Sequence, residues 1–306
     1  MVATPFTDHN LQLACQIGVI DIVVRCPGPK VKDLLPLCRQ VENHGMSVAV
    51  VEGYLPIDQV VLGLEGRQEQ LDKLSQIVRS MGECGIGTLC YDWMGLTNWT
   101  RTSTTTPGRG GALCTEFERQ KAEALGPVDG PRVSAAQLWK NLEHFLQHIL
   151  PVAEKAGVAL AMHPDDPPLS PMRGLERIMI DPQAFERLVQ LAPSPANGIC
   201  FCQGNFAAMG VDIPATIRRL GPHITFVHLR DVKGGPEHFV ETFHDEGPTD
   251  MYEAMRAYRE VGFAGVMRPD HVPILAGETG DAGYTMLGRL FAVGYMRGLI
   301  EAVDKV

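Results

Sequence analysis

Four residues of the types that bind divalent metal ions end short apolar segments in the second half of the chain. Two imidazoles, one thiolate and one carboxylate make a complete ligand set for a divalent transition-metal ion, with room for substrate oxygens if the site is open. The residues are His163, Cys202, His228 and Asp270, at the ends of segments 158–163, 198–202, 224–228 and 265–270. These residue types predict a metal centre, provided that the fold brings the four segments together.

The apolar segments themselves predict such a fold. Short, continuous apolar runs are typical of buried strands in a parallel sheet. In a parallel barrel all strands end at one face, where catalytic groups collect. Taken singly, a strand-end histidine is more often a satisfied polar residue, a strand cysteine a small buried side chain, and Asp270 a loop cap. Their occurrence at four successive strand ends favours the metal site. Cys200 faces the same side as Cys202 one layer deeper, where a core-filling role is more natural.

Strand and helix patterns alternate along the chain. This succession is typical of a parallel sheet covered by helices, and eight strand-like segments favour closure into a (β/α)8 TIM barrel. No G-x-G-x-x-G sequence follows the first strand, which argues against a dinucleotide-binding fold. We therefore expect one α/β domain over residues 1–306. The expected strands are 2–6 (the weakest), 18–24, 47–52, 86–91, 158–163, 198–202, 224–228 and 265–269, and the expected helices are 32–44, 67–84, 135–156, 181–191, 214–220, 251–261 and 286–303.

A long insertion interrupts this alternation after strand 4 of the expected barrel. Residues 92–133 are rich in glycine, proline, threonine and charge, and they show no clear period. Connections of this length are uncommon in compact domains unless they are functional or disordered. Trp93, Trp99 and Arg101 favour a lid over the C-terminal face, because aromatic rings exclude water and a guanidinium binds carboxylates.

Composition limits the classes of partner. The chain has 306 residues, is 45% hydrophobic and carries a formal net charge of −9. This acidity, without basic clusters, argues against binding nucleic acid or an anionic membrane surface. No apolar stretch approaches the ~20 residues of a membrane span, and residues 1–10 lack the regions of a signal peptide. Eight cysteines are too sparse for a disulfide scaffold. We expect a cytoplasmic protein with reduced thiols.

Several segments resemble the mannonate dehydratase family and cover roughly the last two thirds of the chain in the family's order. The most specific are His-Pro-Asp-Asp-Pro-Pro at 163–168 and Arg-Pro-Asp-His at 268–271. Other similar segments are 90–91, 99–102, 174–178, 201–205, 226–230, 241–244, Gly247 with 250–251, 283–285 and 288–290. The resemblance implies a barrel similar to xylose isomerase that converts D-mannonate to 2-keto-3-deoxy-D-gluconate and water. It also implies Mn²⁺ or a related ion. A thiolate ligand predicts a softer preference than an all-oxygen site, so Fe²⁺, Co²⁺ and Zn²⁺ are alternatives.

Position by position, the resemblance implies roles for individual residues. The metal ligands would be His163, Cys202, His228 and Asp270, and the acid and base would be His271 and Tyr284. For the substrate we favour Arg101, Arg177, Trp99 and Asp165; Arg230 and Arg268 compete for the carboxylate, and Asp165 has a loop cap as its alternative role. Asn205, Val240 and Val272 stand where the family tends to have Ser, His and Gly, so they bear on which sugar acid is accepted. We expect a small-molecule sugar acid as partner and a homo-oligomeric assembly.

The chemistry of dehydration supports these roles. The reaction removes the proton beside a carboxylate and expels a hydroxide from the next carbon, so it needs charge stabilisation by a metal and two proton-transfer groups. His271 follows Asp270 directly, and its alternative role is to orient a ligand. The alternative for Tyr284 is packing at the rim. A metal-dependent sugar isomerase or epimerase on the same barrel, or a catalytically silent protein that binds metal or sugar acid, remain the alternative functions.

Overall fold

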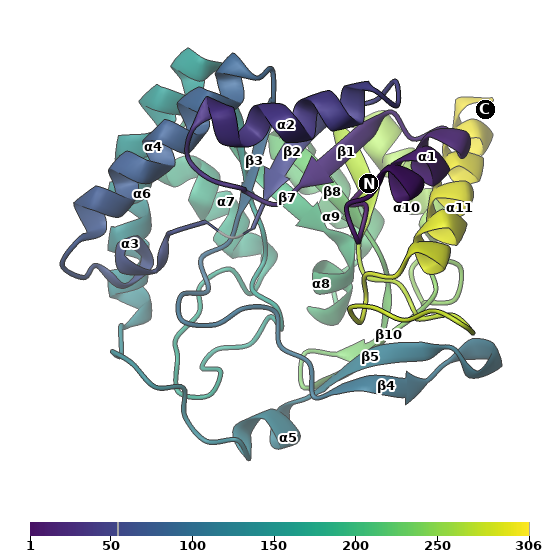
Figure 1. Cartoon of the computed structure of the whole chain (residues 1–306). Helices are drawn as coiled ribbons and strands as arrows, with labels where there is room; N and C mark the ends of the chain where they lie inside the picture. The colour runs from purple at the N-terminus through teal and green to yellow at the C-terminus, as the bar shows by residue number, and fades with distance from the viewer. Residues whose placement is uncertain (54, 306) are drawn as a thin grey trace.

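Seven parallel strands form the central sheet of the computed structural model, which describes residues 1–53 and 55–305 (Figure 1). Each strand pairs in parallel with the next one in the order β1-β2-β3-β6-β7-β8-β11. Their register places Cys202 beside His228, and His228 beside Arg268. The strands are β1 (Asp21–Val24), β2 (Ser47–Glu52), β3 (Thr88–Tyr91), β6 (Ala159–Met162), β7 (Asn197–Cys202), β8 (Ile224–Leu229) and β11 (Val266–Pro269).

The expected strand at 2–6 is reduced to one bridge, between Val2 and Val23. Pro5 has no backbone N–H to donate to a ladder, and the next helix already begins after Thr7, whose side chain accepts from Asn10 N. Arg289 holds this segment from the other side by donating from Nη1 to the Val2 carbonyl at 2.8 Å. The barrel is therefore nearly closed, with seven named strands where eight were expected.

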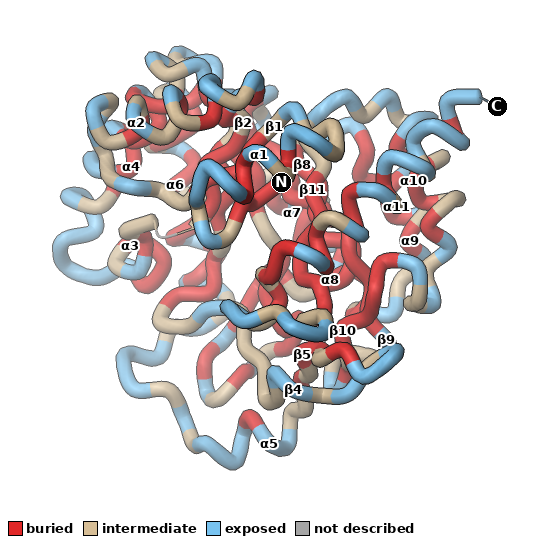
Figure 2. The backbone as a smooth tube through the Cα atoms, turned by 45° about the vertical axis from the view of Figure 1, so that its right-hand side comes forward, coloured by how far each residue is buried: buried red, intermediate tan, exposed pale blue. Residues whose placement is uncertain are grey.

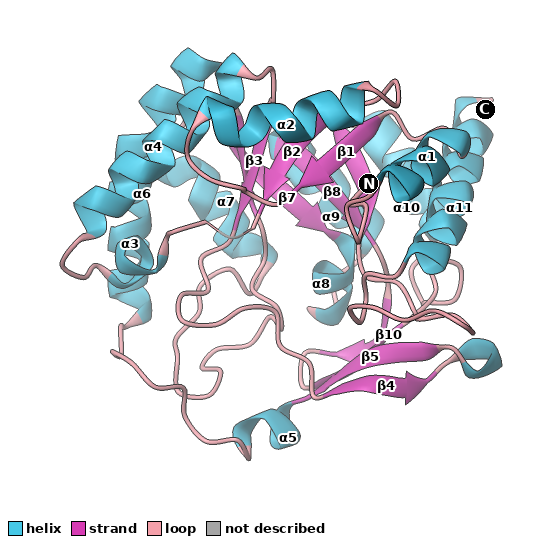
Figure 3. Cartoon of the chain, in the orientation of Figure 1, coloured by secondary structure: helices cyan, strands magenta, loops and turns pink. Residues whose placement is uncertain are grey.

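Helices surround the sheet, as Figure 3 shows. Three of the helices begin at an aspartate N-cap. The Asp181, Asp212 and Asp250 side chains each accept a hydrogen bond from a backbone N–H of the first turn. No helix that the structure describes is long and apolar enough to cross a membrane. The helices are α1 (Asp8–Gln16), α2 (Val31–Glu42), α3 (Asp58–Leu62), α4 (Arg67–Glu83), α5 (Arg119–Glu123), α6 (Ala135–Ala156), α7 (Pro182–Leu191), α8 (Gln203–Ala208), α9 (Ile213–Leu220), α10 (Met251–Glu260) and α11 (Met286–Asp304), with the short 3₁₀ turns η1 (Arg109–Gly111) and η2 (Gly221–His223).

The core has an outer part between helices and strands and a smaller part inside the barrel. Burial follows the strands and the inward faces of the helices, while the outer helix faces are exposed (Figure 2). The inner part consists of small or medium side chains and one aromatic ring, that of Phe226. Its residues are Val2, Val23, Val50, Cys90, Ala161, Cys200 and Phe226. This layer lies inside the barrel, next to the strand-end residues that form the candidate site.

A second, antiparallel sheet was not expected from the sequence. It has the order β4-β5-β10-β9 and lies below the barrel in Figure 3, where β9 contacts α8 and β5 contacts α5. Its first two strands follow β3 and its last two follow β8, so both hairpins leave the barrel where parallel strands end. The segment 92–133 therefore contains β4, η1, β5 and α5 instead of an aperiodic loop. The strands are β4 (Ser103–Pro107), β5 (Leu113–Glu118), β9 (Val232–Gly235) and β10 (His238–Glu241).

Candidate metal centre and active-site cavity

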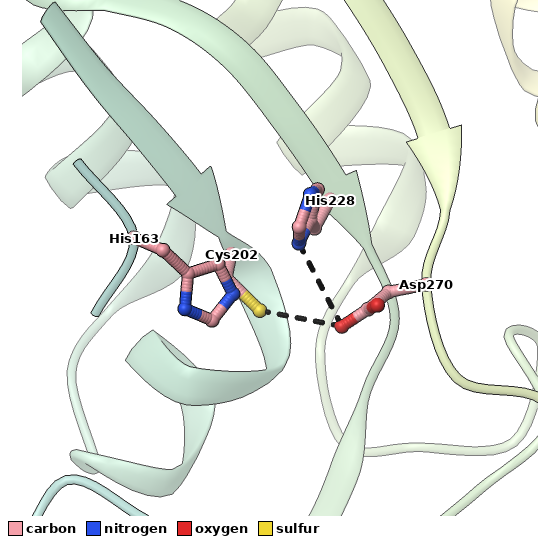
Figure 4. Close-up of side chains that lie close together, drawn as sticks. All are labelled: His163, Cys202, His228 and Asp270. Carbon is pink, nitrogen blue, oxygen red and sulfur yellow. Dashed lines mark hydrogen bonds and ion pairs between the residues drawn. The ribbon is translucent and has the colours of Figure 1, made fainter. Parts of the chain in front are cut away.

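The four predicted ligand residues come together at the carboxyl ends of their strands (Figure 4). One donor atom from each of His163, Cys202, His228 and Asp270 lies within 4.8 Å of the other three. The Cys202 Sγ and the His228 Nδ1 lie 3.6 Å and 3.8 Å from the same oxygen, Oδ2 of Asp270. The expected convergence of four strand ends is thus present as a buried cluster of candidate ligands.

Local hydrogen bonds orient two of these donor side chains, His163 and Cys202. His163 Nδ1 lies 2.7 Å from the carbonyl oxygen of Pro164, which can only accept, so Nδ1 carries the proton and Nε2 keeps its lone pair. The Cys202 thiol donates to Oδ1 of Asn205 at 2.8 Å. Asn205 Nδ2 in turn donates to the carbonyl of Asp165, which fixes the amide orientation. Asn205 therefore orients the candidate sulfur ligand.

The other two donors lie in a strong electrostatic field. Burial and Arg268 favour a neutral imidazole, but the carboxylates of Glu52 and Asp270 outweigh them and raise the pKa of His228 to about 10. Burial opposes ionisation of Asp270, yet the positive charges of Arg268 and Arg230 hold the pKa of that carboxyl well below its usual value. An ionised carboxylate so close to a thiol favours a cation between them. The donor set and its packing therefore fit a divalent ion.

Arginines and carboxylates alternate around the cluster. Arg230 donates from Nε to Asp270 Oδ2 at 2.7 Å and pairs with Asp166 at 2.9 Å and Glu241 at 3.1 Å. Arg268 bonds Glu52 through two nitrogens, at 2.8 Å and 3.0 Å, and lies 3.0 Å from Asp270 Oδ1. Because removing one member would leave an uncompensated buried charge, this network fixes the position of Asp270.

A cavity of about 770 Å³ opens over the cluster. Three of the four candidate ligands line it, namely His163, His228 and Asp270, as do Trp99, His271 and Tyr284. Residues of the predicted lid contribute to its wall: Asp92, Met94, Asn98, Trp99 and Thr104. The cavity is large enough for a small sugar acid.

His271 and Tyr284 form a hydrogen-bonded pair in the cavity wall. His271 Nδ1 donates to Glu241 Oε1 at 2.8 Å, which leaves Nε2 as the acceptor for the Tyr284 hydroxyl at 3.0 Å. The indole of Trp99 packs against the imidazole, with ring centroids 4.8 Å apart. Burial and the charge of Asp270 raise the pKa of Tyr284 to about 12, so the phenol holds its proton at neutral pH.

The structure places the other predicted substrate residues behind the cavity wall. Arg101 bonds both oxygens of Asp166, at 2.6 Å and 3.0 Å, and also contacts Glu241. Arg177 donates to the Pro167 carbonyl and to Thr97 Oγ1, both at 3.1 Å. Asp165 Oδ2 accepts from the backbone of Ile178 and Met179 at 3.1 Å and 2.8 Å. Among the described residues that line the cavity, Trp99 is present, whereas Arg101, Arg177 and Asp165 are absent.

Sequence reasoning missed several charged residues of the site. Glu52 ends β2, so the strand-end rule that selected the metal ligands would have selected it too. Asp166, and not its neighbour Asp165, reaches the cavity. Glu241 lies on β10, a four-residue strand outside the barrel, and no pattern of the kind used for the barrel strands marks it.

Comparison with known proteins agrees with the geometry. The family model for D-mannonate dehydratase (UxuA) matches residues 10–129 and 130–306. Mannonate dehydratase 2 of Halalkalibacterium halodurans is 33% identical over 316 residues, covering 94% of this chain and 91% of that protein. The crystal structure of mannonate dehydratase from Streptococcus suis serotype 2 superposes with a TM-score of 0.90 at 31% identity, covering 98% of this chain and 90% of that one.

A more distant likeness bears on the fold alone. A xylose isomerase-like TIM barrel protein from Mycobacterium smegmatis, solved in complex with magnesium, has a TM-score of 0.61 at 11% identity, covering 97% of this chain and 89% of that one. The expectation of an α/β barrel similar to xylose isomerase is therefore confirmed.

Proposed function

This chain belongs to the mannonate dehydratase family of hydro-lyases, and we propose that it removes water from D-mannonate to give 2-keto-3-deoxy-D-gluconate. The observation that carries this proposal is the cavity itself. A buried His/Cys/His/Asp cluster and the hydrogen-bonded His271 and Tyr284 pair border the same space. Dehydration of a hydroxy acid needs both, because charge must be stabilised beside the carboxylate while two protons move.

In this proposal His163, Cys202, His228 and Asp270 hold one divalent ion. The bound ion would supply Lewis-acid stabilisation of the charge that develops beside the substrate carboxylate. Mn²⁺ is the first choice from the family, and the sulfur donor makes Fe²⁺, Co²⁺ and Zn²⁺ suitable as well. Arg230 and Arg268 keep the Asp270 carboxylate ionised and oriented.

His271 and Tyr284 move the protons. With its Nδ1 proton held by Glu241, the neutral imidazole has a basic Nε2 that takes the proton from the carbon next to the carboxylate. The protonated Tyr284 gives its proton to the departing hydroxyl, which leaves as water. The hydrogen bond between His271 Nε2 and Tyr284 then returns the proton to the phenolate. Both residues end the cycle as they began, and the enol product becomes the keto acid.

Of the four predicted substrate residues, only Trp99 contacts the substrate in this proposal, and Arg101, Arg177 and Asp165 act from behind the cavity wall. Trp99 contacts the substrate directly and packs on His271. Arg101 acts through Asp166, which lines the cavity. Arg177 and Asp165 hold the loop between β6 and α7 in shape. Asp165 accepts from the backbone of residues 178–179, and Arg177 donates to the Pro167 carbonyl and to Thr97.

The segment 92–133 serves as a cover of the site, inserted after the β3 strand end. Its first part carries cavity residues, and its second part is anchored, because β5 pairs with both β4 and β10. We therefore assign any closing motion to residues 94–102, since a strand paired on both sides is held in place.

The test is a direct assay. The purified protein is incubated with D-mannonate and each of Mn²⁺, Fe²⁺, Co²⁺ and Zn²⁺, and formation of a 2-keto-3-deoxy acid is followed. We expect product with at least one ion and none after chelation. An epimerised hexonate without the keto acid would identify the protein as an epimerase instead. Absence of any conversion would leave a binding protein.

A further inference from the structure

A second group of soft donors lies one layer below the candidate metal centre. Cys90 on β3, Cys200 on β7 and His228 on β8 each offer a donor atom within 4.8 Å of the other two. All three residues are buried, with exposed fractions of 2%, 0% and 1%. Only His228 belongs to both groups, and the proposed dehydration uses neither thiol.

His228 turns its Nε2 edge toward this deeper group. Its Nδ1 faces Asp270, but its buried Nε2 makes no hydrogen bond within residues 1–53 and 55–305. Oε2 of Glu52 lies 3.5 Å from Nε2, and Glu52 is the register neighbour of Cys90 on the adjacent strand. Among the described residues Nε2 therefore has only a long ion-pair contact on this side, and a cation there would give it a direct bond with the Glu52 carboxylate as counter-charge.

The donor chemistry selects the class of ion. Two sulfur atoms and one imidazole suit a soft cation, and bonds of about 2.0–2.3 Å to such an ion place the donors of a tetrahedral site roughly 3.5 Å apart. Donors that lie within 4.8 Å need only small side-chain shifts to reach that spacing. An ion can enter from the cavity, because Cys90 and His228 line it.

We propose that Cys90, Cys200 and His228 form a second site that binds a thiophilic cation such as Cd²⁺ or Zn²⁺, and that an ion bound there inhibits the enzyme. Inhibition follows because an ion on Nε2 pulls the His228 ring toward Cys90 and away from the upper ligands. Binding is independent of the proposed dehydratase activity, whereas the inhibitory consequence rests on it.

Cadmium titration of the metal-free protein tests the binding. Thiolate-to-cadmium charge-transfer absorption counts sulfur ligands, and the upper group can supply only Cys202. Wild type would use three thiolates, and loss of the deeper site in Cys200→Ser would leave Cys202 alone. We expect the absorption at saturation to fall to about a third of wild type, or to about two thirds if Cys90 still binds, with affinity at least ~10-fold weaker. Cys114→Ser, which removes a buried thiol of the second sheet, is the matched control and should behave as wild type. Cys200→Ala provides a second variant should the serine disturb packing.

The opposite results overturn the proposal. Wild-type absorption and affinity in both Cys200 variants would show that the deeper thiols bind no ion. An equal loss in Cys114→Ser would show that the signal reports cysteines in general.

Activity measurements then test the consequence. With Mn²⁺ in excess and D-mannonate as substrate, Cys200→Ser should need at least ~10-fold more free Cd²⁺ for half inhibition than wild type. Equal inhibition of both proteins would place the inhibitory ion at the upper site and refute the regulatory role. If neither protein is active with any metal, the proposed function fails, while the cadmium titration still decides the deeper site.

Discussion

Replacing His271 by Asn separates proton transfer from metal binding. His271 lies next to Asp270, but its Nε2 is 3.8 Å from Asp270 Oδ1 and hydrogen-bonds Tyr284 instead. Successive residues of an extended segment point to opposite sides, so both cannot readily reach one ion. We therefore expect the variant to keep its metal while turnover falls by ~10² to 10⁴-fold, which is the usual contribution of one general acid or base.

The structure also limits the cost in stability. The substitution removes two hydrogen bonds, one to Glu241 and one to Tyr284, each worth ~1 kcal/mol. Glu241 keeps Arg101 and Arg230 as partners, so no buried charge is left uncompensated. The free energy of unfolding should fall by about 2 kcal/mol, and the protein should remain folded at assay temperature.

Three measurements on one preparation decide the matter: metal content by elemental analysis, turnover with D-mannonate, and urea unfolding. His223→Asn is the matched control, since His223 is an exposed histidine of η2, just before β8 and at the opposite end of that strand from His228. Loss of metal in parallel with activity would make His271 a ligand and would transfer its role to Tyr284. Unchanged turnover would remove it from the mechanism.

Three further predictions concern the ligands, the cover and the buried charges. His228→Ala and Cys202→Ala should each weaken metal binding by ~10 to 100-fold or more, and unchanged metal content in both would refute the proposed ligand set. In hydrogen exchange with and without a sugar acid, amides of residues 94–102 should gain protection while those of β5 stay constant; equal protection in both states would exclude a moving cover. Burial would raise the pKa of Asp166, but Arg101 and Arg230 lower it below its usual value, so its stabilising effect is complete above about pH 4 and is lost as pH falls further. Asp166→Asn should therefore flatten the dependence of unfolding free energy on pH below about 4, by up to ~1.4 kcal/mol per pH unit, and identical slopes for the two proteins would contradict this.

The convergence of the candidate metal ligands was predictable because each one depends on a local pattern. An apolar run such as 224–228 predicts a buried strand, and parallel strands share one end, so the residue type at that end is enough. The prediction of a strand at 2–6 was wrong, because the apolar pattern there is weak and Pro5 has no backbone N–H to donate to a strand ladder. The sequence analysis also missed β4. Its residues, Ser103–Pro107, are polar and largely exposed on both faces, so the sequence shows no apolar alternation there.

The residues that orient the proposed proton-transfer pair could not be predicted from strand ends, because they lie outside the barrel. Glu241 on β10 orients His271, and Arg101, just before β4, holds Glu241. These residues meet because β5 pairs with both β4 and β10, which joins the insertion after β3 to the hairpin after β8. The second sheet therefore sets the position of the imidazole, while the strand ends of the barrel bring the candidate metal ligands together. A substitution that weakens the β5–β10 pairing should consequently affect turnover before it affects metal content.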